Sequence, residues 1–155
     1  QVEQVALFQA RLQLLDGLRA DAVDADALIS QTPDGVCYTE PETSAEAYVI
    51  MLDRIRRRYP QAEIYCLSPL CRRNENACQT AVITAMNAGI EAAASRYGAC
   101  YVDLYAGAGI APQQDVFDCY MMDILHPNAN GQAAIADALV RAIRANTSLT
   151  LPDPE

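Results

Sequence analysis

The chain has 155 residues, of which 52% are hydrophobic, and a formal net charge of -9. This length and apolar content suit a single domain, which we expect over residues 1–146, followed by a tail over 147–155. The acidic balance disfavours nucleic acids and anionic membranes as partners, since both require a positive surface. No apolar run approaches the roughly 20 residues of a membrane span, and the N-terminus lacks a signal-peptide pattern. We therefore expect a soluble protein, either cytoplasmic or secreted with its signal removed.

All eleven basic residues are arginine, so the chain cannot use Schiff-base chemistry or a phosphate loop that depends on lysine. The six cysteines permit three disulfides in an exported protein or free thiols in a cytosol. Cys66 and Cys100 fall within apolar runs typical of buried strands, whereas Cys71 and Cys78 flank a polar turn and are the best candidate disulfide. No Cys-x-x-Cys pair occurs, which argues against a zinc site.

Hydrophobic periodicity predicts an alternation of helices and strands. The predicted elements are a helix over 2–20, a short strand at Ala27–Ser30, a loop over 31–42, a helix over 43–59, a strand over 64–67, a long helix from Asn74 or Asn76 to Tyr97, a strand over 99–104 and a last helix after Pro127. Thr43 and Glu46 have the spacing of a capping box, and Pro60 ends the helix that they begin. Gly98 is the expected stop of the long helix.

This order of elements is typical of an α/β fold in which right-handed crossovers build a parallel sheet with helices on both faces. Functional groups of such folds gather at the carboxyl ends of the strands. Residues 106–109 lie at one such end and contain two glycines. They lack the full spacing of a nucleotide-binding loop, and Pro112 follows them where a helix would be required.

The only histidine, His126, follows Asp123 by three residues in the loop before the last helix. Histidine is the side chain whose unperturbed pKa lies nearest neutrality, and a carboxylate that accepts a hydrogen bond from one ring nitrogen fixes the imidazole tautomer. The second nitrogen is then available to take a proton from a hydroxyl nucleophile. By spacing alone, Asp-x-x-His is more often a capping or core arrangement, so the pattern leaves a structural role open as well.

Residues 122–136, which read Met-Asp-Ile-Leu-His-Pro-Asn-Ala-Asn-Gly-Gln-Ala-Ala-Ile-Ala, resemble the last conserved block of the SGNH, or GDSL, hydrolases. The resemblance covers about residues 43–145 and includes the segment Tyr101-Val102-Asp103-Leu104. It implies a three-layer flavodoxin-like fold and a Ser-His-Asp mechanism in which Asp123 and His126 are the acid and base. The implied activity, as an esterase, lipase or acylhydrolase, is hydrolysis of an ester or acyl bond in a small molecule, without metal or cofactor.

The chain also departs from that family. The Gly-Asp-Ser block, which supplies the nucleophile, and the next block, which supplies an oxyanion glycine, do not occur in these 155 residues. The nearest likeness to the third block, Gly-x-Asn-Asp, is residues 31–35, where Pro33 stands in place of Asn and has no donor for an oxyanion. Asp34 and Gly35 are the candidate substrate-binding residues at this position.

Two serines lie at predicted strand ends, where a nucleophile could sit. They are Ser30 and Ser68, although nothing in the sequence around them forms a nucleophile elbow. The alternative for both is that they end strands or cap turns. The nucleophile therefore stays unassigned at this stage.

Three interpretations follow. In the first, the chain is the C-terminal part of an SGNH-type hydrolase whose first strands lie outside this sequence. In the second, it is a non-catalytic relative that binds a ligand or partner through the same cleft. In the third, it is a structural subunit in which His126 ties the last helix to the sheet. A sheet of three strands would leave an exposed edge, which proteins usually cover. We therefore expect a second chain or a homodimer at that edge.

Overall fold

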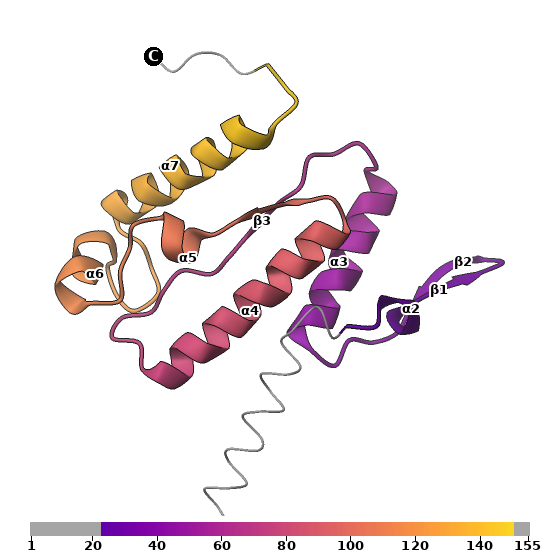
Figure 1. Cartoon of the computed structure of the whole chain (residues 1–155), viewed down its shortest axis with the longest axis horizontal. Coiled ribbons are helices and arrows are strands. Elements are labelled where there is room, and N and C mark those ends of the chain that lie inside the picture. The colour runs from indigo at the N-terminus through magenta and orange to yellow at the C-terminus, as the bar shows by residue number, and fades with distance from the viewer. Residues whose placement is uncertain (1–22, 151–155) are drawn as a thin grey trace, which may run out of the picture.

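The computed structural model describes residues 23–150, so the helix expected over residues 2–20 lies outside the described part of the chain. The elements are α2 (Ala25–Leu28), β1 (Ile29–Thr32), β2 (Gly35–Tyr38), α3 (Ser44–Arg58), β3 (Tyr65–Leu67), α4 (Ala77–Arg96), β4 (Cys100–Val102), α5 (Leu104–Gly107), α6 (Gln114–Tyr120) and α7 (Ala129–Asn146). Figure 1 shows α3 and α4 on one side of the β3 segment, and α7 on the other. The β1–β2 hairpin projects at the end of the molecule opposite α6.

Strands β3 and β4 form a parallel pair whose two faces are covered by different helices. Cys66 and Tyr101 lie opposite each other in the register and belong to the core that contains buried residues of α3 and α4. The next pair, Leu67 and Val102, belongs to a second core with residues of α6 and α7, including the fully buried Phe117. Side chains in a strand alternate between faces, so one short parallel pair contributes to both cores.

The predicted α/β class is confirmed, but the predicted extended parallel sheet is not formed among residues 23–150. The described strands make two separate sheets of two strands each, one antiparallel and one parallel. Helices therefore cover both faces of a parallel pair rather than of a wide three-layer sheet. The crossover from β3 to β4 through α4 is the one βαβ unit in the described part of the chain.

The strand predicted at Ala27–Ser30 lies two residues later in the structure, and it is largely exposed rather than buried. Asp24 caps a single helical turn by accepting hydrogen bonds from the backbone N–H groups of Asp26 and Ala27, so this turn extends to Leu28. The strand starts at Ile29 and forms a largely exposed antiparallel hairpin with β2 instead of a buried parallel strand. The capping hydrogen bonds of Asp24 therefore make this segment helical, although its short apolar run predicted a strand.

Strand β2 lies inside the predicted loop over residues 31–42. Pro33 and Asp34 make the turn, and Gly35 follows with φ of 135°, a conformation that side-chain-bearing residues rarely adopt. Along β2, Val36 and Tyr38 are half-buried whereas Gly35 and Cys37 are exposed. This alternation is the sequence signal for the strand, and the loop prediction overlooked it.

A buried carboxylate fixes the hairpin to α3. Asp53, which is 7% exposed, accepts a hydrogen bond of 2.8 Å from the Tyr38 hydroxyl and one of 2.5 Å from Arg57 Nε. Burial, followed by the hydrogen bond to Asp53, raises the pKa of the Tyr38 hydroxyl. The Arg54 guanidinium lies 4.4 Å from the centre of the Tyr38 ring, so charged groups of α3 hold the end of the hairpin from two sides.

The long predicted helices are confirmed, and their ends follow from capping. Thr43 and Glu46 make the predicted capping box at the start of α3. Of the two predicted starts of α4, the structure selects Asn76, which forms a capping box with Gln79. Gly98 ends α4 with φ of 60°, as a C-terminal glycine does.

The segment after β4 contains two short helices that the periodicity did not predict. The strand expected up to Leu104 ends at Val102, because Asp103 caps α5 by accepting a hydrogen bond from the Ala106 N–H. Seven-residue α6 follows, and Phe117 anchors it in the second core. Both helices are too short for apolar periodicity to distinguish them from loops.

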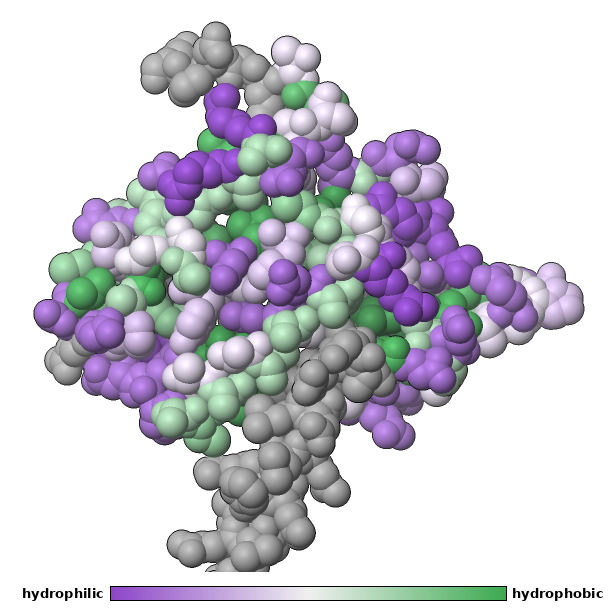
Figure 2. All heavy atoms as spheres, in the orientation of Figure 1, coloured by the Kyte–Doolittle hydropathy of each residue, from purple (hydrophilic) through white to green (hydrophobic). Residues whose placement is uncertain are grey.

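The face of the molecule drawn in Figure 2 is mixed in polarity and includes a weakly apolar band. Figure 2 shows this band as pale green side chains along α4, flanked by hydrophilic residues coloured purple. Within residues 23–150, none of the helices combines the length and apolar character needed to cross a membrane.

Candidate active site

The segment between α6 and α7 is a closed turn. Met121 and Pro127 form an antiparallel bridge across its base. Within the turn, the Met122 N–H donates a hydrogen bond of 2.8 Å to the His126 carbonyl. Just outside it, the Asn128 N–H donates one of 2.9 Å to the Tyr120 carbonyl. The main chain on both sides of residues 123–126 is thus held by backbone hydrogen bonds.

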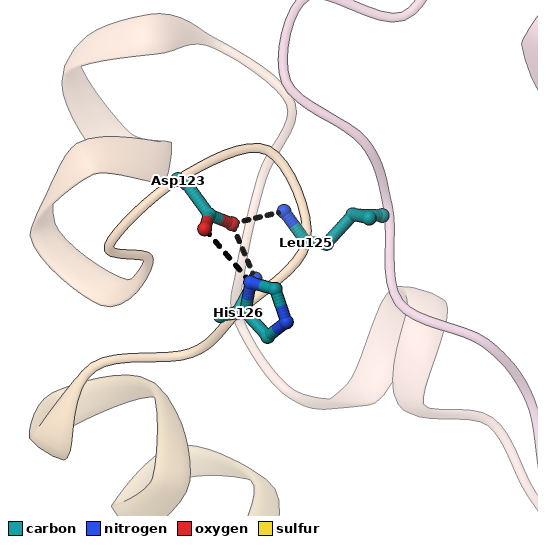
Figure 3. A network of polar contacts seen from close by, with 3 residues as sticks. All are labelled: Asp123, Leu125 and His126. Atoms are coloured by element: carbon teal, nitrogen blue, oxygen red, sulfur yellow. Dashed lines mark hydrogen bonds and ion pairs between the residues drawn. The ribbon is translucent and has the colours of Figure 1, made fainter.

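The carboxylate of Asp123 organises the inside of this turn. Its Oδ1 accepts hydrogen bonds of 2.8 Å from the backbone N–H groups of Leu125 and His126, which is the Asx-turn pattern. Its Oδ2 lies 2.7 Å from His126 Nδ1. Figure 3 shows the two backbone N–H groups and the imidazole facing the carboxylate, with the second ring nitrogen directed away from it. One carboxylate therefore sets both the path of the main chain and the orientation of the ring.

These contacts also determine the charge of Asp123. The backbone N–H of Leu125, followed by the His126 ring and the His126 N–H, lowers the pKa of this carboxyl to about 2. The carboxylate is consequently ionised at any ordinary pH and accepts the proton of Nδ1, which leaves Nε2 as the acceptor of the neutral ring. No described residue hydrogen-bonds to Nε2.

The pair is open to solvent. The side chain of His126 is 68% exposed and that of Asp123 is 52% exposed. An ion pair this exposed contributes little to stability, typically below about 1 kcal/mol. Exposure does not fit the interpretation in which a buried His126 ties the last helix to the sheet, whereas it leaves the ring accessible to a reactant.

Helix α7 begins immediately after the turn and holds it against α6. Asn128 caps α7 by accepting hydrogen bonds from the backbone N–H groups of Asn130 and Gly131. The side-chain amides of Asn128 and Asn130 both donate to the Cys119 carbonyl, at 3.1 and 3.2 Å. The polar run that predicted the start of the last helix therefore also fastens it to the end of α6.

An apolar groove of about 560 Å³ runs along one side of the turn. The two residues between Asp123 and His126, namely Ile124 and Leu125, form part of its wall. The rest of the lining comes from the segment after β3 and from the first turns of α4: Pro69, Leu70, Cys71, Arg72, Cys78, Gln79, Val82, Ile83 and Met86. Sequence reasoning missed this groove, because the only signal was that two large apolar residues occupy a short polar turn.

The predicted disulfide partners Cys71 and Cys78 both line this groove as free thiols. Burial raises the pKa of the Cys71 thiol, which donates a hydrogen bond of 3.0 Å to the Ile110 carbonyl. All six cysteines fall within the described residues, and none is in a disulfide. Within the same residues, no cluster of three or more His, Cys, Asp or Glu side chains could hold a metal ion.

Ser68, one of the two candidate nucleophiles, is buried at 3% exposure and fully engaged in local hydrogen bonds. Its Oγ accepts a hydrogen bond of 2.9 Å from the Tyr105 N–H and lies 3.3 Å from Asp103 Oδ1. It also lies 3.2 Å from the carbonyl oxygen of Pro69. These contacts join the carboxyl ends of β3 and β4, so the environment of Ser68 is that of a structural serine.

The remaining sequence candidates lie far from the histidine turn. Ser30 is exposed in β1, and Asp34 and Gly35 are at the tip of the hairpin. Figure 1 shows this hairpin at the opposite end of the molecule from the loop that joins α6 and α7. Of the predicted site residues, the structure thus brings together only Asp123 and His126.

Comparison with known proteins identifies the family. The sequence profile of the GDSL-like lipase/acylhydrolase family matches residues 6–134, a span that includes the histidine turn. The chain therefore belongs to the GDSL-like lipase/acylhydrolase family. No curated protein matches it.

A solved structure supports the fold. The crystal structure of a protein from Lactobacillus plantarum superimposes with a TM-score of 0.63 at 20% sequence identity. The match covers 83% of this chain and 64% of that protein, so the chain spans less than two thirds of the length of the solved structure that it matches. At this identity the likeness shows a shared fold, consistent with the mixed α/β arrangement of β3, α4 and β4.

Proposed function

We propose that the chain carries the acid–base pair of a serine ester hydrolase, with His126 as general base and Asp123 as the carboxylate that orients it. The observation that carries the proposal is the 2.7 Å contact between Asp123 Oδ2 and His126 Nδ1, in an exposed turn within the family match. Membership of a lipase/acylhydrolase family makes ester or acyl bonds in small molecules the expected substrates.

The chemistry follows from the fixed tautomer. Nε2 accepts the proton of a serine hydroxyl while the serine oxygen attacks the acyl carbon, and then gives it to the departing alcohol. A water molecule attacks the resulting acyl-serine in the same way, which releases the acid and restores the hydroxyl. Asp123 stays ionised throughout and stabilises the imidazolium that forms in each half of the reaction. One water is consumed, and one acid and one alcohol are produced.

The test compares hydrolysis of p-nitrophenyl butyrate by the full chain and by two variants, His126→Ala and Asp123→Asn. Loss of general-base catalysis lowers kcat/KM by about 10²- to 10⁴-fold. The matched control is Asp137→Asn on α7, whose exposed carboxylate has no hydrogen-bond partner among the described residues. Equal rates for the unmodified chain and His126→Ala would overturn the role of His126.

A second experiment identifies the nucleophile. A fluorophosphonate probe reacts with an activated serine, and peptide mapping of the labelled protein names the residue. The buried contacts of Ser68 predict that it stays unlabelled. Labelling that depends on His126 would show directly that the imidazole activates the labelled hydroxyl.

A second candidate, a non-catalytic subunit that pairs with another chain, is favoured by a different observation. Among the described residues, β3 pairs only with β4, so each strand has an outer edge without a neighbouring strand. Open edges are usually covered in native proteins. Absence of probe labelling, together with a defined dimer or heteromer in light scattering, would favour this function over hydrolysis.

A further inference from the structure

A second cleft lies at the hairpin end of the molecule, between the segment that ends β2 and one face of α3. Its volume of about 530 Å³ is within the range of small-molecule sites, about 300–1,000 Å³. Tyr38 and the three residues after it form one wall. Residues of α3 at spacings of three and four form the other: Ala47, Ile50, Met51, Arg54 and Ile55. Figure 1 shows the hairpin at the opposite end of the molecule from the loop that joins α6 and α7, so this cleft is separate from the histidine turn.

Both walls of this cleft are held by contacts within the chain. On the α3 side, Ile50 is buried and belongs to the core. On the opposite side, the Thr39 N–H donates a hydrogen bond of 2.9 Å to the Leu28 carbonyl, and the Thr39 hydroxyl donates one of 3.2 Å to the Ala27 carbonyl. The ring of Pro41 restricts the main chain of the next residues. The cleft is therefore pre-formed, which lowers the entropic cost of binding a ligand.

Arg54 brings a positive charge to this cleft. Its guanidinium lies 4.4 Å from the centre of the Tyr38 ring, and the Tyr38 hydroxyl donates a hydrogen bond of 2.8 Å to Asp53. The hydrogen bond fixes the ring, and the ring in turn orients the guanidinium that lies over it. Arginine stays charged in proteins, and Arg54 forms an ion pair with no carboxylate among the described residues. Its charge is therefore oriented but not neutralised.

The neighbouring arginines of α3 are engaged elsewhere. Arg56 donates hydrogen bonds to backbone carbonyl groups that follow α3 and α4, and Arg57 pairs with Asp53. In the cleft, the planar fork of Arg54 matches the two oxygens of a carboxylate. Glu40 also lines the cleft, and its charge disfavours a ligand with a second negative group.

We propose that this cleft binds a small monocarboxylate with an apolar body, held by its carboxylate on Arg54 and by its apolar part against Met51 and Ile55. The proposal combines one oriented, unpaired guanidinium with an apolar helix face in the same pre-formed cleft. It goes beyond ester hydrolysis, because the cleft and the histidine turn share no residue.

The first experiment titrates 3-phenylpropanoate into the methyl-labelled full chain and follows NMR shifts. We expect saturable shift changes at the methyl groups of Ala47, Met51 and Ile55, but not at Val140 on α7, with a Kd on the order of 1 mM for a ligand of this size. The amide 3-phenylpropanamide has the same shape without the charge, so it is expected to bind about fivefold more weakly or worse. Equal affinities for the acid and the amide, or no shift at the cleft methyl groups, would overturn the proposal. Tighter binding of 3-phenylpropylamine would also overturn it, since recognition would then belong to Glu40.

A charge substitution then locates the carboxylate. Arg54→Gln is expected to lower the affinity for 3-phenylpropanoate by about fivefold or more and to leave that for the amide unchanged, since only the acid pairs with the guanidinium. The matched control is Arg58→Gln, which removes the same charge from the same helix. The Arg58 guanidinium lies 5.2 Å from the centre of the Tyr59 ring, outside the cleft, so this variant keeps the affinity within about twofold. Equal losses in the two variants would show a response to net charge alone and would overturn the site, as would unchanged affinity in folded Arg54→Gln.

An apolar substitution tests the other half of the site. Met51 is 42% exposed and lines the cleft, so Met51→Gln is expected to weaken binding of the acid and of the amide by the same factor. Circular dichroism checks that each variant is folded. Unchanged affinity of folded Met51→Gln for both ligands would contradict the placement of the apolar body. All these experiments measure binding alone, so failure of this site would leave the proposed hydrolysis intact, and loss of the proposed hydrolysis would leave this site intact.

Discussion

The main chain of Gly131, in the first turn of α7, lies directly against the carbonyl group of Tyr120 at the end of α6. A Cβ atom at position 131 would overlap the Tyr120 oxygen and lie 2.9 Å from the Cβ of Pro127. Because the histidine turn is closed by these same residues, Gly131→Ala requires α7 to move away from the turn. We expect a loss of about 1–3 kcal/mol in the free energy of unfolding, the usual cost of overpacking. Urea denaturation followed by circular dichroism measures it.

The control for this substitution is Gly107→Ala. Gly107 is helical, and no atom lies within 4 Å of a Cβ built on it. Alanine has the higher helix propensity, so this variant is expected to be neutral or more stable by up to about 1 kcal/mol. Similar losses in the two variants would show that the contact with Tyr120 is not what requires glycine at position 131.

The tautomer of His126 is directly measurable, since the chain has one histidine. With Asp123 Oδ2 at 2.7 Å from Nδ1, the neutral ring is expected to carry its proton on Nδ1 and to leave Nε2 unprotonated. Nitrogen-15 NMR of the ring distinguishes the two forms. In Asp123→Ala nothing accepts the Nδ1 proton, so the population with the proton on Nε2 rises. Asp137→Asn should keep the original spectrum, and a dominant Nε2–H form in the unmodified chain would contradict the geometry.

Much of the fold was predictable where a local signal and a periodic one agree. The capping boxes at Thr43 and Asn76 precede long amphipathic or apolar stretches, and both helices begin as predicted. Asp24 and Asp103 show the opposite case. Asp24 caps a one-turn helix that overlaps the strand predicted at Ala27–Ser30, and Asp103 caps one that overlaps the end of the strand predicted over 99–104. A single side-chain hydrogen bond decides the conformation there, and a short apolar run cannot reveal it.

The candidate site was likewise predictable from the sequence only in part. Pairing of Asp123 with His126 follows from a spacing of three residues in a tight turn, so sequence alone predicted that contact. The groove depends on residues after β3 and on α4, which approach Leu125 only in the folded chain. Ser68 lies at a strand end, where the sequence allows a nucleophile, and only the structure shows that its hydroxyl contacts the Tyr105 N–H and the Asp103 carboxylate.

Ser68→Ala is therefore expected to affect stability. The substitution leaves the half-buried Tyr105 N–H without its 2.9 Å acceptor, which costs about 1–2 kcal/mol in the free energy of unfolding. Chemical denaturation measures this loss. Ser30→Ala is the control, because Ser30 is exposed and a surface substitution typically changes stability by less than about 0.5 kcal/mol. Unchanged stability of Ser68→Ala, with loss of ester hydrolysis, would instead assign Ser68 to the reaction.

Glu63 fastens the residues after α7 to the segment before β3, and this contact predicts a pH dependence. The hydroxyl of Thr147, followed by the backbone N–H and the hydroxyl of Ser148, donates to its carboxylate at 2.6 to 2.7 Å and lowers the pKa of Glu63 from 4.5 to about 2. A carboxyl with a lowered pKa stabilises the folded chain fully above its ordinary pKa, and this contribution is lost as the pH falls from about 4.5 toward about 2.

We expect the difference in Tm between the unmodified chain and Glu63→Gln to be constant near neutral pH and to shrink over that acidic interval, because protonation of Glu63 makes the two chains alike in charge. Carboxyl NMR titration gives the pKa itself, which should rise toward 4.5 in the double variant Thr147→Val, Ser148→Ala. Glu40→Gln is the control, since Glu40 is exposed and has no hydrogen-bond partner among the described residues. A Glu63 titration unaffected by the double variant would show that the hydroxyl contacts do not hold its carboxylate, and the segment after α7 would then need another attachment to β3.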